Sequence, residues 1–64
     1  MKELKEGIKF EITCKKATLF CVDLAIEEGL ELDDVDVDLL VAFIEMKIEL
    51  MNEIEKLKYL LTII

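Results

Sequence analysis

The stretch LVAFIEMKIELMNEIEKLKYLLTII (residues 40–64) decides the fold. Its apolar residues recur at spacings of three and four, the period of one helix face, with charged side chains between them. Three acids, Asp33, Asp34 and Asp36, stand just ahead of the stretch, where carboxylates can bind the free backbone N–H groups of a helix start. The sequence therefore predicts one long helix over residues 34–61.

A second helix is predicted over residues 17–28. Leu19, Val22 and Ile26 form one face, and the neighbouring apolar residues widen it, so most sides of this helix should be covered. Gly29 follows at a position where helices commonly stop, because Gly adopts the left-handed conformation at little cost. The connection that remains, residues 29–33, is short and favours antiparallel packing of the two helices.

Residues 8–14 allow two interpretations. Apolar and polar residues alternate along this segment, which is typical of a strand. A helix would instead extend the face of Leu19, Val22 and Ile26 toward the N-terminus, but it would bring Glu11 and Lys15 into the same stripe. Gly7 also weakens a helix at this point. The sequence leaves strand and helix open here.

The composition points to self-association. The chain has 64 residues, of which 55% are hydrophobic, and its mean hydropathy is +0.43. A chain this short buries only roughly 60% of the surface that its unfolded form exposes. A disulfide is not expected to help, because Cys14 and Cys21 would lie about 10 Å apart along a helix. There is no His to bind a structural metal, so oligomerisation remains as the means of covering the apolar surface.

The predicted architecture is a single all-α domain over residues 1–64. We expect an antiparallel helical hairpin that packs with a second copy as a homodimeric four-helix bundle. The predicted oligomer interface consists of Leu40, Phe43, Ile44, Ile48, Leu50, Ile54, Leu57 and Leu61.

An order of strand, helix, Gly and helix over residues 8–48 resembles the ribbon-helix-helix family of small dimeric DNA-binding proteins. The resemblance rests on the alternating segment, on the helix ending at Gly29 and on the helix that follows. It implies an alternative: a strand at 8–14 pairs across a dimer, and Lys9, Glu11 and Thr13 read DNA in a transcriptional regulator. The family's phosphate-binding helix start would here be acidic and repel phosphate, so nucleic acid is not the expected partner.

No enzymatic, cofactor or metal chemistry is predicted. Without any His, Cys14 and Cys21 lack a base to activate them, and their apolar neighbours favour buried structural thiols. Residues 34–45 have the acid spacing of an EF-hand calcium loop, but Leu39 stands where the loop needs Gly. A 64-residue chain is also too small to enclose a substrate pocket.

Charge and targeting features complete the expectation. Residues 1–22 carry five Lys and three Glu, a net charge of +2, and residues 23–64 carry twelve acids and three Lys, a net charge of −9. An acidic exterior keeps a protein soluble and suits a basic protein surface as partner.

No stretch of about 20 apolar residues spans a membrane, and a cytoplasmic location is expected. All basic residues are Lys, a bias typical of AT-rich genes such as those of some phages. The sequence thus predicts a non-enzymatic, self-associating protein–protein interaction module: an adaptor, inhibitor or accessory subunit.

Overall fold

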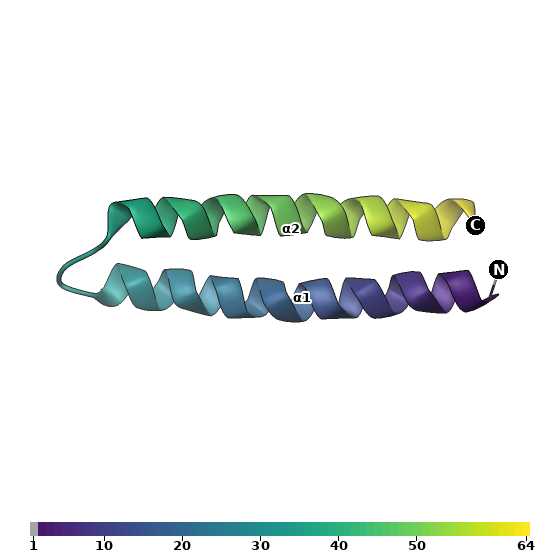
Figure 1. Ribbon diagram of the computed structural model, residues 1–64, viewed down its shortest axis with the longest axis horizontal. Helices are drawn as coiled ribbons and strands as arrows, with labels where there is room; N and C mark the ends of the chain where they lie inside the picture. Colours follow the sequence, from purple (N-terminus) through teal and green to yellow (C-terminus); the bar gives the residue numbers. More distant parts are fainter. Residues whose placement is uncertain (1) are drawn as a thin grey trace.

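Two long helices joined by a short loop make up the protein (Figure 1). The computed structural model describes residues 2–64, with α1 at Lys2–Glu31 and α2 at Val37–Ile63. The helices run side by side in opposite directions, so that the start of α1 and the end of α2 lie together, away from the loop. The Cα atoms span 50 × 14 × 11 Å. The predicted all-α hairpin is confirmed.

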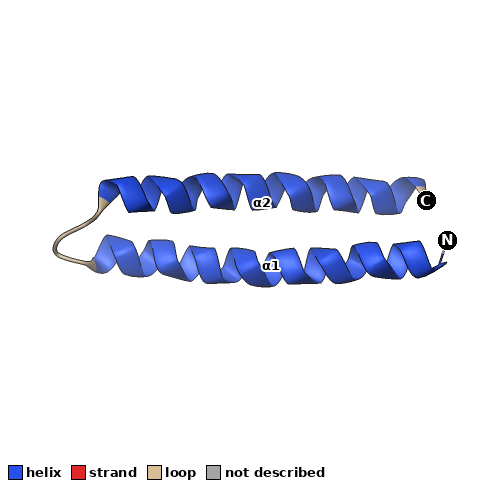
Figure 2. Cartoon of the chain, in the orientation of Figure 1, coloured by secondary structure: helices blue, strands red, loops and turns tan. Residues whose placement is uncertain are grey.

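The strand alternative for residues 8–14 is not supported, because this segment lies within α1 and is helical throughout (Figure 2). The helix buries Ile8 and Ile12 against α2. Lys15 is no obstacle, since its long side chain extends to the edge of the contact and places the ammonium beside Glu53. Glu11 stays at the exposed edge, so neither charged residue has to enter the apolar contact.

Gly29 is not the helix stop that the sequence predicts. Helix α1 continues through it to Glu31, and no glycine among residues 2–64 has a positive φ. The structure gives Gly29 another role: a Cβ at this position would lie 2.7 Å from Cδ2 of Leu40 on α2. The missing side chain therefore lets the two helices approach each other beside the loop, and the predicted elements 8–14 and 17–28 form one helix.

The helices meet along a seam in which spacings of three and four alternate on both sides, as in a coiled coil. Its buried side chains are Ile8, Ile12 and Val22 from α1 and Leu40 and Ile54 from α2. The half-buried seam positions of α1 are Lys5, Lys15, Leu19, Ile26 and Gly29. Those of α2 and its C-cap residue are Phe43, Lys47, Leu50, Leu57, Leu61 and Ile64. The main apolar cluster, centred on Ile8, Ile12 and Ile54, lies in the half of the hairpin remote from the loop.

Helix α2 begins where Asp36 caps it. Asp36 has an extended backbone (φ −83°, ψ 97°), and its Oδ1 accepts a hydrogen bond of 3.2 Å from the backbone N–H of Leu39. The helix therefore starts at Val37 rather than at residue 34, and it runs to Ile63 rather than 61. One of the three predicted capping acids thus performs the capping.

Removing this cap should destabilise the hairpin. We expect Asp36→Ala to lower the free energy of unfolding by about 1 kcal/mol, because one N–H at the start of α2 loses its acceptor. Asp34→Ala is the matched control, since it removes the same charge from the loop outside the cap. Urea denaturation of the two variants measures the difference. Equal losses would show that the aspartates act through charge alone.

Candidate protein-interaction surface

Most of the residues predicted to join two copies lie in the seam of a single chain. Leu40 and Ile54 are buried against α1. Half-buried positions on the same line are Phe43, Leu50, Leu57 and Leu61. Ile44 and Ile48 alone among the predicted set are exposed. Contacts within the single hairpin therefore cover most of the apolar stripe that the sequence predicts as a dimer interface.

A large apolar surface remains outside the seam. Among residues 2–64, five hydrophobic side chains are buried, whereas sixteen large ones are exposed. Those on α1 are Leu4, Phe10, Phe20, Leu24 and Leu30, and those beyond it are Leu32, Val37, Leu39, Val41, Ile44, Met46, Ile48, Met51, Tyr59, Leu60 and Ile63. Isolated apolar side chains are ordinary on a protein surface, whereas contiguous apolar patches are typical of interaction sites, so these residues are the candidates for one.

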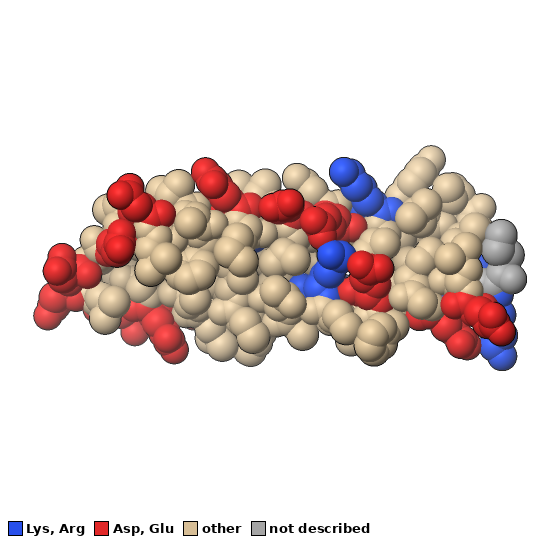
Figure 3. All heavy atoms as spheres, in the orientation of Figure 1, with Lys and Arg blue, Asp and Glu red and all other residues tan. Residues whose placement is uncertain are grey.

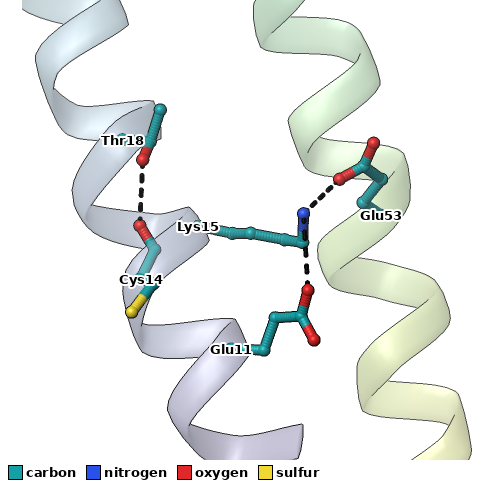
Figure 4. A network of polar contacts seen from close by, with 5 residues as sticks. All are labelled: Glu11, Cys14, Lys15, Thr18 and Glu53. Atoms are coloured by element: carbon teal, nitrogen blue, oxygen red, sulfur yellow. Dashed lines mark hydrogen bonds and ion pairs between the residues drawn. The ribbon is translucent and has the colours of Figure 1, made fainter.

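A polar cluster crosses the middle of the seam (Figure 4). The ammonium of Lys15 donates a hydrogen bond to the carboxylate of Glu53 on α2 and lies 3.9 Å from Glu11 on its own helix. The hydrogen bond to Glu53 and the nearby negative charges raise the pKa of Lys15 above its ordinary value, although partial desolvation opposes them. A second pair joins Lys47 of α2 to Asp23 of α1 at 2.8 Å. In both pairs a seam lysine meets an acid of the opposite helix.

The Lys15 pair predicts a loss of stability at alkaline pH. A raised pKa means that the folded state holds the proton more tightly, so the contribution is complete below the ordinary lysine pKa and disappears as pH rises through the raised one. We expect the free energy of unfolding to decrease more between about pH 9 and about pH 11 in the native protein than in Lys15→Met. The two proteins differ only at position 15, so the difference between their pH dependences isolates Lys15. Parallel pH curves would contradict the prediction.

The two cysteines are exposed, so the expectation of buried thiols is wrong for a single hairpin. Figure 4 shows the side chain of Cys14 directed away from α2. The apolar neighbours that suggest burial in the sequence, among them Phe10 and Phe20, are themselves exposed. Apolar neighbours along a sequence indicate burial only when the helix face they share is covered.

The acids are distributed over the surface rather than gathered around a site. Carboxylates crowd the loop end and follow α2, while uncharged surface covers much of the middle of α1 (Figure 3). Asp34 lies in the loop, Asp36 caps α2 and Asp38 belongs to its first turn, so the calcium-loop spacing is divided between loop and helix. Over residues 2–64, no three Cys, Asp or Glu side chains come together as a metal site requires. Neither helix, within the same residues, offers a stretch long and apolar enough to span a bilayer.

The candidate site is thus the set of exposed apolar side chains, on a molecule whose carboxylates crowd the loop end and follow α2 (Figure 3). Contacts between proteins combine an apolar centre with a polar rim. Phe10, Phe20 and Tyr59 are among the exposed residues, and aromatic side chains are enriched in such contacts. In comparisons with known proteins, no protein-family model matches the chain, and no curated protein or solved structure matches it either.

Proposed function

We propose that the protein is a non-enzymatic protein–protein interaction module that associates with copies of itself and serves as an adaptor, inhibitor or accessory subunit in the cytoplasm. The observation that carries the proposal is the excess of large apolar side chains exposed outside the seam. A homodimeric four-helix assembly is the simplest arrangement that would cover part of this surface.

The shape of the hairpin supports self-association. Each helix has a neighbour on one side only, and the Cα atoms measure just 14 × 11 Å across. Apolar surface gains about 25 cal/mol per Å² when it leaves water, so the uncovered sides favour a second layer of helices. A copy of the chain is the partner available at every place where the chain is made.

The exposed apolar line on α2 favours a different partner. It consists of Val41, Ile44, Ile48 and Met51, and it includes the two predicted interface residues that lie outside the seam. Glu45 adjoins Val41 and Ile48 at helical spacings of four and three residues. A second acidic copy would bring like charges together here, whereas a basic surface with an apolar centre would complement the line.

The ribbon-helix-helix alternative is not proposed. It depends on a strand at residues 8–14, and that segment is helical. It also needs a phosphate at the start of the second helix, where Asp33, Asp34 and Asp36 stand. Binding to duplex DNA would require these carboxylates to face phosphates, which repel them.

Sedimentation equilibrium tests the proposal. At a protein concentration of about 10–100 µM we expect a mass of at least twice the 7.4 kDa of one chain. The melting temperature should also rise with protein concentration, because association stabilises the folded state by mass action. A folded protein that stays monomeric over this range would overturn the proposed function.

A further inference from the structure

We propose that two copies join through the outer side of α1, with the two α1 helices packed antiparallel and each α2 on the outside. The inference rests on the proposed self-association and names its surface. That surface is the outer line, formed by Gly7, Phe10, Cys14, Ala17, Cys21 and Leu24.

The outer line repeats the pattern of the seam on the opposite side of α1. Its members are spaced by three and four residues, and they lie roughly half a helical turn away from Ile8, Ile12 and Val22. None carries a charge, and the side chains of Phe10 and Leu24 are 70% and 42% exposed. A helix with apolar lines on two opposite sides is suited to being covered on both.

No packing contact of the single hairpin requires a glycine at position 7. A glycine inside a helix costs about 1 kcal/mol relative to alanine. At Gly29 the contact with Leu40 accounts for the missing side chain, but a Cβ added to Gly7 would meet nothing within 4 Å. A second copy that approaches closely at Gly7 supplies the reason that the isolated hairpin lacks.

Side-chain sizes fix the alignment. When the outer lines of two copies run antiparallel with Cys14 opposite Ala17 of the second copy, Phe10 lies opposite Cys21 and Gly7 opposite Leu24. Every large side chain then meets a small one, as close packing of two helices requires. A shift by one heptad in one direction would set Phe10 against Glu28, and a shift in the other direction would set Cys21 against Glu3.

Charge fixes the orientation. Residues 2–16 of α1 carry five Lys and three Glu, a net charge of +2, whereas residues 17–31 carry Asp23, Glu27, Glu28 and Glu31 and no Lys, a net charge of −4. Antiparallel packing places the basic half of each α1 beside the acidic half of the other. Parallel packing would place the four carboxylates of one acidic half beside the same four of the second copy, which repel them. The carboxylates that crowd the loop end and follow α2 (Figure 3) are not members of the outer line.

A matched pair of substitutions tests the surface. Ala17→Glu places a carboxylate at the centre of the proposed contact, and we expect it to raise the dissociation constant of the dimer by about 100-fold or more while the hairpin stays helical. Ile48→Glu introduces the same charge on α2, at a side chain that is 55% exposed, and should leave the dimer intact. Sedimentation equilibrium gives the masses and circular dichroism the helix content. If the native protein dimerises and Ile48→Glu alone dissociates it, the outer line is wrong but the proposed function stands.

Gly7→Leu separates association from folding. It should raise helix propensity and leave the hairpin at least as stable, yet weaken the dimer, because a leucine here meets Leu24 of the second copy. An unchanged dimer would contradict the close approach.

Disulfide trapping tests the relative orientation of the two α1 helices, and it does so even if Ala17→Glu fails to fold. Two single-cysteine proteins keep each thiol from bonding within its own helix: one retains Cys14 (Cys21→Ala), and the other carries Ala17→Cys with Cys14→Ala and Cys21→Ala. When the two are mixed and treated with glutathione disulfide, the thiol at position 17 should bond to Cys14 of the other copy. Bonds joining identical positions of two copies would indicate parallel helices, and the absence of a covalent dimer would also overturn the proposal.

Discussion

Ile54→Ala is expected to remove most of the stability of the hairpin. The side chain of Ile54 is 5% exposed and belongs to the cluster with Ile8 and Ile12. Truncating a buried Ile to Ala costs about 2–4 kcal/mol, through lost burial and the cavity left behind. A small domain has only a few kcal/mol to lose, so the variant should be largely unfolded where the native protein is folded.

Ile48→Ala is the matched control for this experiment. It makes the same chemical change in the same helix, with the same gain in helix propensity, at a side chain that is 55% exposed. We expect its free energy of unfolding to stay within about 0.5 kcal/mol of the native value. Urea denaturation at one protein concentration compares the three proteins. Similar losses at both positions would mean that the seam is not the main apolar contact.

The double substitution Lys15→Leu, Lys47→Leu is expected to raise the melting temperature by roughly 5 °C or more. Both lysines occupy half-buried seam positions, where leucine would complete the apolar repeat. The acids left behind, Glu53 and Asp23, are partly exposed and keep their hydration, so the lost ion pairs should cost little.

The same substitution should reduce the precision with which the helices align. Polar residues within an apolar seam restrict the number of ways in which helices can pair. We therefore expect the double variant to form mixed or larger oligomers, visible by sedimentation as a broader range of masses than the native protein gives. A lower melting temperature would show that the two ion pairs stabilise the hairpin more than leucine burial can.

The sequence predicts α2 well because its apolar period extends over many turns. Leu40 and Ile54, taken from that period, are the buried residues of α2. Residues 8–14 are harder, since a short apolar run fits both periods and Lys15 looks incompatible with a buried face until its ammonium is seen to reach Glu53. The strand or helix choice depends on a contact 38 residues away in the sequence, which local pattern does not contain.

The interaction surface is harder to predict than the helices. Periodicity identifies apolar positions such as Leu40 and Ile44 without saying which of them the chain itself will cover. The side of α2 on which α1 packs distinguishes the two residues, because α1 covers Leu40 and leaves Ile44 exposed. Gly29 shows the same limit of local patterns: a glycine after a helical stretch favours a stop, and only the position of Leu40 reveals a packing contact instead.

The place of the main cluster bears on how the chain folds. Gly29 and Leu40 are 11 residues apart in the sequence and can meet early, but Ile12 and Ile54 are 42 residues apart. Bringing distant residues together costs more chain entropy than closing the turn, and the apolar gain arrives only when both helices are nearly complete. The hairpin is therefore expected to form in one concerted step, with a transition state that spans both helices, instead of zipping up from the loop.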